Sequence, residues 1–240
     1  MLRRRVNIPS FRVGDYIYFM YPNNELSRIP SNSCIGVCIL YDNRRIMIEK
    51  YGDYKDSLGL SYSMYNWGDC KTNQTKIPNY TSVGGGEDGD SGYLSGIYSP
   101  KLNRDPSTWT SGALGDWSGK SHSEVIKTLL SSGSSWTSTE TIGYVLTKFL
   151  ESETSLGYND WYIPSCGQLA LIYLMVDDVN NSLIKIGGNP LKTSSTGYWS
   201  SSEMKMYRGE MVSWYIEFKD GYVGGNIKSG EKYVRFIRDV

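Results

Sequence analysis

The sequence predicts an α+β fold in which strands open and close the chain and helices lie between them. Runs of apolar, β-branched and aromatic residues occur near the N-terminus and again from residue 198 onward, as is typical of strands. Between them, apolar residues recur at the three- and four-residue spacing of amphipathic helices. Strands and helices do not alternate along the chain, so nothing indicates a parallel sheet of β-α-β units.

Three strands are predicted near the N-terminus. Residues 13–19 are compact and aromatic, residues 34–40 form a continuous apolar run, and residues 45–49 are apolar after a turn signal at Asp42 and Asn43. Together they predict a small antiparallel sheet.

We divide the chain into two parts with no linker between them. Residues 1–60 form a predicted N-terminal antiparallel β module, and residues 61–240 form a second domain that contains a long irregular region. Residues 1–10 carry three consecutive arginines, which fit either a solvated terminus or a docking arm. Residues 51–118 are rich in Gly, Ser, Asn and Tyr, and a structureless stretch of that length is uncommon unless it is functional or carries short strands of its own.

Two helices are predicted in the middle of the chain. The first covers residues 122–130, with Ser121 and Ser123 as candidate N-caps. The second covers residues 139–150 and places its apolar side chains on one face.

A third helix and the closing strands follow. The helix is predicted to begin at Ser165 and to end at Asn180. Residues 212–218 form a predicted strand, residues 219–221 a hairpin turn before the return strand, and residues 233–238 a final strand.

Charge and hydropathy exclude two kinds of partner. Lys plus Arg and Asp plus Glu both number 25, whereas nucleic-acid binding selects basic faces. No apolar run is long enough to span a bilayer, and the basic N-terminus lacks the apolar segment of a secretory signal peptide. We therefore expect neither nucleic-acid binding nor membrane insertion.

The cysteines and the aromatic residues each leave alternatives open. The 4 cysteines lack the paired spacing of zinc sites, so we expect buried free thiols, with one disulfide as the alternative. Cys34 and Cys38 are expected to point to the same face of a strand. The chain has 20 Tyr and 7 Trp but only 5 Phe. Aromatic rings with a polar group suit half-buried strands, and they also suit a recognition surface that offers apolar contact and stays hydrated.

Three stretches of the C-terminal third carry a family resemblance. Residues 160–165 read D-W-Y-I-P-S before a predicted helix, and residues 198–203 read Y-W-S-S-S-E. Residues 214–218 read W-Y-I-E-F and are followed by G-Y-V at 221–223 and Y-V-R at 233–235. These stretches resemble the C-type-lectin-like domain of surface proteins of gut bacteria and their phages.

That family is related in fold to formylglycine-generating enzymes and to retroelement-diversified phage variable proteins. The resemblance spans roughly residues 13–238, and residues 116–121, D-W-S-G-K-S, are similar to a run that precedes a helix in the family. It implies a C-type-lectin-like fold for the second domain, in which the motif residues determine the fold and the segments between them form the recognition surface.

The sequence departs from the family's calcium-binding and catalytic members. The Glu-Pro-Asn or Gln-Pro-Asp triplet of sugar-binding members is missing, and the acidic loop with Glu87, Asp88 and Asp90 fits a solvated loop better than a calcium site. Formylglycine-type catalysis would require cysteines in the C-terminal part of the chain, and none follows Cys166. The single histidine, His122, has no nucleophile-elbow motif beside it and is expected at the surface or in a cap. We expect no metal, no cofactor and no enzymatic activity.

The sequence thus predicts a recognition domain on a virion or another extracellular surface. It would bind a cell-surface glycan or protein without calcium, through a surface formed by residues 205–210, residues 224–231 and the long irregular region. The candidate contact residues are Tyr207, Arg208, Asn226 and Lys228.

The alternative is a structural virion protein, such as a capsid decoration or fibre component. It would contact other virion or surface proteins rather than an external ligand, and residues 1–10 would then be its docking arm. Self-association remains open under both hypotheses.

Overall fold

The structure is a computed structural model that describes residues 17–23, 25–41, 44–52, 54, 58, 60, 64–68, 76–87, 89–131, 139–152, 155 and 157–240. The predicted turn at 42–43 and the arm at 1–10 lie outside these residues. Within the described part of the chain, the fold is mixed α+β, as predicted, with four α-helices and three sheets.

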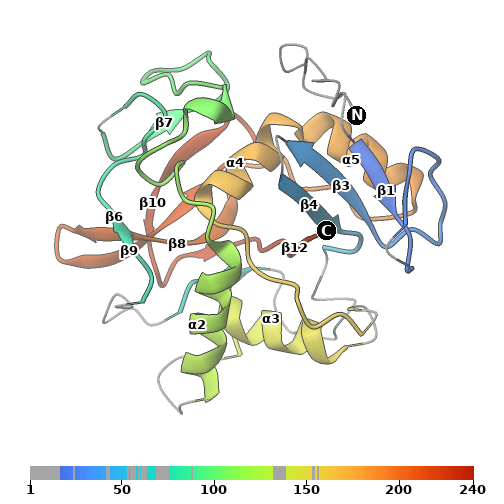
Figure 1. The fold of residues 1–240 in the computed structure, drawn as a ribbon. Helices are drawn as coiled ribbons and strands as arrows, with labels where there is room; N and C mark the ends of the chain where they lie inside the picture. Colours follow the sequence, from blue (N-terminus) through green and yellow to red (C-terminus); the bar gives the residue numbers. More distant parts are fainter. Residues whose placement is uncertain are drawn as a thin grey trace, which may run out of the picture.

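The first sheet contains strands from both ends of the chain. It has the order β12-β4-β3-β1-β2 and is antiparallel throughout, with β1 at Ile17–Met20, β2 at Leu26–Ser27, β3 at Gly36–Tyr41, β4 at Arg44–Glu49 and β12 at Ile237–Asp239. The strand β12 lies beside β4 in Figure 1. Residues 1–60 and 61–240 therefore share this sheet.

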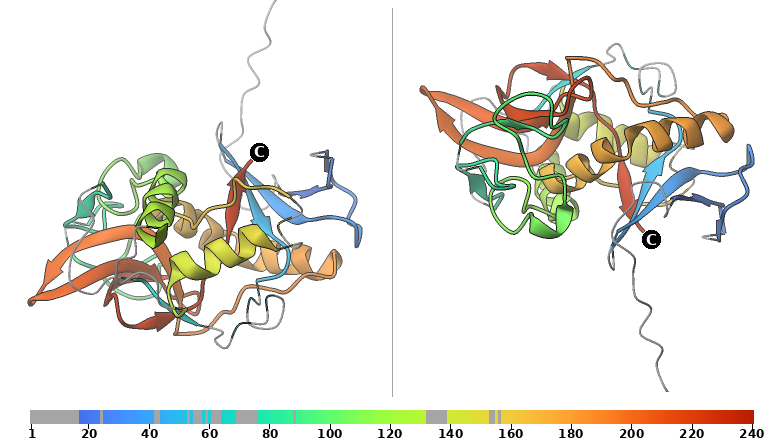
Figure 2. Two further views of the ribbon diagram at one scale, coloured as in Figure 1. Left: turned by 90° about the horizontal axis from the view of Figure 1, so that it is seen from below. Right: turned by 90° about the horizontal axis from the view of Figure 1, so that it is seen from above.

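The second sheet is built around a meander. Its order is β6-β8-β9-β10-β7, with β6 at Asn79–Tyr80, β7 at Gly92–Tyr93, β8 at Tyr198–Tyr207, β9 at Glu210–Ile216 and β10 at Tyr222–Ile227. The predicted hairpin between β9 and β10 is confirmed: the Gly221 N–H donates to the Glu217 carbonyl, and Gly221 has a φ of 72°. In Figure 2 the β8–β9 hairpin extends away from the helices.

The irregular region contains short strands and a 3-10 helix of its own, one of the two possibilities that its length left open. It contributes β6 and β7 to the second sheet, and β5, Tyr65–Asn66, pairs with β11, Glu231–Lys232. A 3-10 helix, η1, covers Pro106–Thr108. These strands are only two residues long, too short for hydrophobic periodicity to reveal them.

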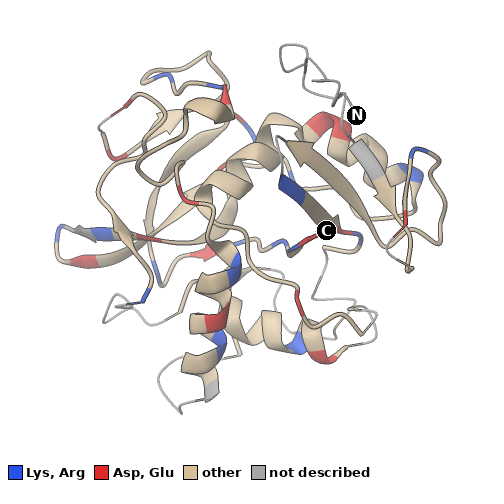
Figure 3. Cartoon of the chain, in the orientation of Figure 1, with Lys and Arg blue, Asp and Glu red and all other residues tan. Residues whose placement is uncertain are grey.

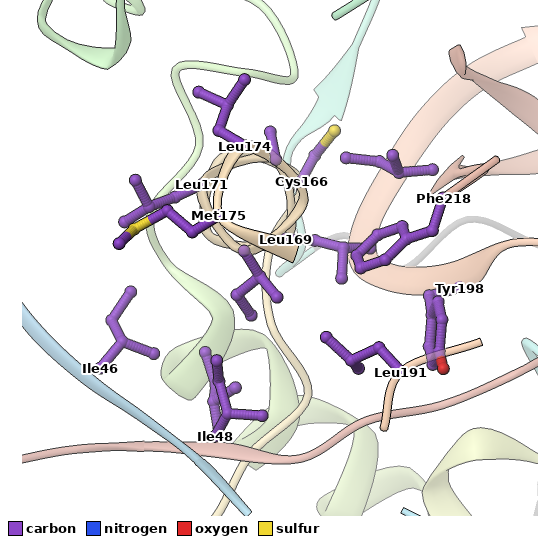
Figure 4. Packing of buried hydrophobic residues seen from close by; sticks show 14 of the residues in the cluster. Ile46, Ile48, Cys166, Leu169, Leu171, Leu174, Met175, Leu191, Tyr198 and Phe218 are labelled. Atoms are coloured by element: carbon purple, nitrogen blue, oxygen red, sulfur yellow. The ribbon is translucent and has the colours of Figure 1, made fainter. Parts of the chain in front are cut away.

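The helix α4, Cys166–Leu174, lies at the centre of the larger core. Every residue of α4 except Tyr173 is buried, as expected for a helix that is apolar on all sides. Figure 4 shows Ile46 and Ile48 of β4 on one side of this helix, and Leu191, Tyr198 and Phe218 on another. The helix thus joins the two sheets into one core.

The end predicted for the third helix at Asn180 is wrong. The chain bends at Met175 and continues as α5, Val176–Lys185. Asn180 lies inside α5, where its side-chain amide donates to the Leu191 carbonyl and accepts from the Leu191 N–H, at 3.1 and 2.6 Å. The amide therefore holds a following loop instead of ending a helix.

The two middle helices begin at other residues than predicted. α2 covers Gly119–Ser131, so Ser121 and Ser123 lie within it and do not cap it. α3 covers Ile142–Glu151, and its cap is Thr141, whose hydroxyl accepts from the Tyr144 N–H at 3.2 Å. Figure 1 shows α2 and α3 next to each other, away from β7.

The cysteines are buried free thiols where the structure describes them, namely Cys34, Cys38 and Cys166; Cys70 lies outside the described residues. The prediction that Cys34 and Cys38 share a face is wrong, because Cys34 belongs to the core around α4 and Cys38 to the second core cluster. Cys34 precedes β3, so strand alternation does not reach it.

The replacement Gly167→Ala tests how closely α4 packs on residues 114–116. Alanine normally favours a helix over glycine by about 1 kcal/mol. Here a Cβ would lie 2.4 Å from the Leu114 carbonyl oxygen and 2.6 Å from that of Asp116, so we expect a net loss of about 1–3 kcal/mol in the free energy of unfolding.

Gly143→Ala in α3 is the matched control, because the atoms nearest to its Cβ belong to the side chains of Ile126 and Leu130 and not to the backbone, so we expect a smaller loss of stability. Urea-induced unfolding measures both variants. A Gly167→Ala protein more stable than the wild type would contradict the packing of α4.

Candidate binding surface

Four tyrosines form a continuous row on the second sheet. The ring centroids of Tyr98 and Tyr93 lie 5.3 Å apart, those of Tyr93 and Tyr222 5.1 Å, and those of Tyr222 and Tyr215 5.9 Å. We call Tyr93, Tyr98, Tyr215 and Tyr222 the tyrosine patch. It extends from the loop after β7 across β10 to β9.

The patch is exposed at one end and buried at the other. Tyr98 is 51% exposed and its neighbour Ile97 is 75% exposed, whereas Tyr215 is buried. Exposed large apolar side chains side by side are unusual on a soluble surface and mark binding sites when they gather. Aromatic rings with a hydroxyl also bring large contact area at a low cost in conformational entropy.

A groove borders the patch. It has a volume of about 430 Å³ and is lined by Asp90, Ser91, Met204, Val212, Tyr222 and Gly225. Tyr222 belongs to both features, so a ligand stacked on the patch could place polar groups beside Asp90 and Ser91. Gly225 lets the groove exist beside Met204, since a Cβ at residue 225 would lie 2.3 Å from the sulfur of Met204.

Charged groups surround the inner end of the patch. The Tyr215 hydroxyl donates to Glu217 at 3.1 Å, and the Lys232 Nζ lies 3.6 Å from the centroid of the Tyr215 ring. Burial lowers the pKa of Lys232 to about 8, against the opposing effect of Glu217. Burial, with the carboxylate of Asp220 as the next cause, raises the pKa of Tyr93. Tyr93 therefore stays a neutral hydrogen-bonding group at physiological pH.

Arg208 and Asn226 lie at the far end of the same sheet. Arg208 is exposed in the turn between β8 and β9, where it has a φ of 50°. Asn226 is half-buried on β10 opposite Ser213. Tyr207 ends β8 opposite Glu210, and its side chain lies outside the described part of the structure. Figure 3 shows residues of both charge signs on this hairpin.

Lys228, the fourth predicted contact residue, is not exposed. Its side chain is 0% exposed, and its Nζ forms an ion pair with Glu203 Oε1 at 2.6 Å. The ring of Trp67 covers the ammonium at 4.5 Å, and the Trp67 N–H donates to the Lys228 carbonyl at 2.8 Å. The expectation of an exposed Lys228 is wrong, because this lysine fastens residues 64–68 onto the sheet.

His122 is also buried, contrary to the surface or capping position expected for it. It is 2% exposed, and its Nδ1 lies 3.3 Å from Ser201 Oγ and 3.6 Å from Asp116 Oδ2. The Ser202 hydroxyl donates to the same Asp116 oxygen. In a Ser-His-Asp triad the serine and the acid contact different ring nitrogens, whereas here both face Nδ1. This buried polar cluster can hold elements together and offers no nucleophile to solvent.

The residues that carry the family resemblance are buried around this cluster. The serines of Y-W-S-S-S-E are fully buried within β8, whose pairing with β9 shifts register between Trp199 and Glu203. The Ser201 N–H donates to the Pro164 carbonyl, and the Cys166 N–H donates to Ser202 Oγ. The motifs at 160–165 and 198–203 therefore contact each other in the core.

Among the described residues, no group of three or more His, Cys, Asp and Glu side chains is placed to hold a metal ion; Asp88 of the acidic loop is not among them. None of the helices within the described ranges has the length and apolarity needed to cross a membrane.

Comparisons of the chain with protein-family models, with curated proteins and with solved structures yield no match. The candidate site is therefore defined by the geometry of this chain alone.

Sequence reasoning did not single out the exposed Tyr98 or the half-buried Tyr93 and Tyr222 of the patch. The available signals were the high tyrosine count and the tyrosine-rich irregular region. Neither could show which tyrosines meet, because β7 and β10 are more than 120 residues apart in sequence.

Replacing Lys228 by Met tests the buried ion pair. The change leaves the Glu203 carboxylate buried without its cation, so we expect a loss of about 3–5 kcal/mol in the free energy of unfolding. A double variant, Glu203→Leu with Lys228→Met, should recover at least half of that loss. Chemical denaturation measures both.

Lys127→Met is the control for charge removal, because Lys127 pairs with the exposed Glu124 on α2. It should change stability by no more than about 1 kcal/mol. An equally small effect of Lys228→Met would show that the pair is not buried as described.

His122 should make stability depend on pH. Burial lowers the pKa of His122 below its usual 6.5, although Asp116 opposes the shift. The folded state therefore resists protonation, so its stability is fully present above pH 6.5 and falls as the pH drops towards the folded-state pKa.

The slope can reach about 1.4 kcal/mol per pH unit. Urea unfolding of the wild type and of His122→Asn at pH 7.5 and 5.5 measures it, and His122 is the only histidine of the chain. The wild type should lose more stability than the variant; equal losses would mean that His122 accepts a proton freely in the folded protein.

Proposed function

We propose that the chain is a non-catalytic recognition domain of a phage or bacterial surface protein, with a C-type-lectin-like fold. It would bind a cell-surface glycan or protein without calcium, and the tyrosine patch would be the contact surface. The observation that carries this proposal is the row of Tyr98, Tyr93 and Tyr222 with its exposed neighbour Ile97 and its adjoining groove.

The chemistry of the patch supports a glycan as the first ligand class to test. Flat aromatic faces stack on the apolar faces of sugar rings, and a few convergent polar groups fix orientation. Here the rings of Tyr93 and Tyr98 supply the faces, and Asp90 and Ser91 in the groove supply hydrogen-bonding groups. Tyr98 adds its ring at the exposed end of the row, where a ligand meets it first.

The position of the resemblance motifs supports the C-type-lectin-like assignment. The motif residues at 160–165 and 198–203 meet one another in the core, and Tyr215 and Tyr222 at the inner end of the patch belong to motif stretches, whereas Tyr93 on β7 and the exposed Tyr98 in the loop after β7 lie outside them. The exposed end of the patch thus lies in a segment between the motifs, which is where the resemblance implies recognition.

The replacement Tyr98→Ala tests the proposal. Binding of the labelled protein to intact candidate host cells and to isolated surface glycans is measured with and without EDTA. We expect saturable binding that EDTA does not change, and a loss of at least tenfold in affinity for Tyr98→Ala, about 1.4 kcal/mol. Its melting temperature should stay within about 2 °C of the wild type, because exposed side chains contribute little to stability.

Tyr144→Ala is the matched control, since Tyr144 is a half-buried tyrosine on α3, distant from β7 in Figure 1. It should leave binding unchanged. Binding that EDTA abolishes would overturn the calcium-independent mode. Binding that both variants lower equally would place the contact surface elsewhere, and no binding by a folded protein would favour the structural virion alternative.

A further inference from the structure

A second hollow lies on the first sheet, whereas the tyrosine patch lies on the second. It has a volume of about 290 Å³ and is lined by Met20, Leu26, Arg45, Arg238 and Val240. This volume is close to the lower limit of the volumes typical of small-molecule binding sites, about 300 Å³. Three of the lining residues are apolar and two carry guanidinium groups.

Strand pairing explains why these side chains meet. Arg238 lies opposite Met47 in the β12–β4 ladder, and the Val240 N–H donates to the Arg45 carbonyl. Residues two apart on a strand share a face, so Arg45 lies on the same face as Met47 and Arg238. The opposite face of β4, with Ile46 and Ile48, packs on α4 (Figure 4).

The buried arginine of this hollow is only partly neutralised. Arg238 is 7% exposed; its Nη2 contacts Asp160 Oδ2 at 3.1 Å, and its guanidinium stacks 3.8 Å from the centroid of the Tyr158 ring. Its Nε and Nη1 have no hydrogen-bond partner among the described residues, and Asp160 is 31% exposed and so screened by water. A buried guanidinium with donors left over favours an additional anion nearby.

The second arginine adds to this positive field. Arg45 is exposed and takes part in no ion pair with a described residue. It also lines a neighbouring hollow of about 280 Å³ together with Arg44 and Asp239. The Asp239 carboxylate accepts a hydrogen bond from the Tyr162 hydroxyl at 2.5 Å. This hydrogen bond engages one carboxylate oxygen of Asp239, so Asp239 neutralises the arginines less.

We propose that the hollow between Arg45 and Arg238 binds a carboxylate carried on a short aliphatic chain. The carboxylate lies against the guanidinium of Arg45, which can bind it with two parallel hydrogen bonds, within the field of Arg238. The chain lies on Met20, Leu26 and Val240. This site is independent of the tyrosine patch and of the function proposed for it.

Octanoate is the probe, titrated into the full chain by isothermal calorimetry, with 1-octanol and acetate as matched partial ligands. Octanoate binds saturably with one site, and each partial ligand binds at least tenfold more weakly because it lacks the charge or the apolar chain. Raising the salt from 0.15 to 1 M weakens octanoate binding, since the screening length falls from about 8 to 3 Å.

Two single-charge variants locate the site. Arg45→Gln raises the Kd of octanoate at least tenfold, whereas Arg44→Gln, an exposed neighbour on the opposite face of β4, changes it by less than about threefold. Leu26→Asn narrows the difference in affinity between octanoate and acetate. Both arginine variants keep the melting temperature of the wild type, because neither side chain is buried.

Three results would overturn the proposal. They are no saturable binding of octanoate to the wild type, equal effects of Arg45→Gln and Arg44→Gln, and binding of 1-octanol as tight as that of octanoate. Each of these can occur with glycan or cell binding intact, so the test does not depend on the tyrosine patch.

Discussion

The fold depends on the hydrogen bonds of Asp116, which join three segments far apart in the sequence. Its carboxylate accepts from the Ser118 N–H at the start of α2 and from the Ser202 hydroxyl of β8, at 2.9 and 2.5 Å. Its carbonyl accepts from the Ser165 hydroxyl and the Gly167 N–H at the start of α4. A buried carboxylate is tolerated only where such donors surround it, so the helix starts and the strand are held in one mutual arrangement.

The central position of α4 follows from that arrangement. With its N-terminus held by Asp116 and by the Gln168 side chain, which accepts from the Ser165 N–H at 2.9 Å, the helix runs between the two sheets. The chain then returns to the first sheet through β12. A second buried ion pair, between Arg235 and Glu49 at 3.1 Å, fastens this return. The N-terminal strands thus depend on the last residues of the chain.

The sequence predicted the parts of the fold that local patterns encode. The strands around Val37, Ile46 and Trp214 and the β9–β10 turn follow from apolar runs and from Gly221, and they are confirmed. The burial of Lys228 could not be predicted, because it depends on Glu203 from another strand and on Trp67 from the irregular region. The same holds for the tyrosine patch, since pairing of two-residue strands leaves no periodic signal.

The buried tryptophans and the exposed end of the tyrosine patch have separate positions in this molecule. Trp67 and Trp199 are fully buried, and their indole N–H groups donate to the backbone carbonyls of Ser200 and Tyr65 at 2.7 and 2.8 Å. These hydrogen bonds hold residues 65–67 of the irregular region against β8 inside the core. The exposed ring of Tyr98 and the half-buried ring of Tyr93 lie outside this network of hydrogen bonds. A surface whose aromatic side chains contribute little to the core can change its specificity without loss of stability, which is the property that a recognition domain needs.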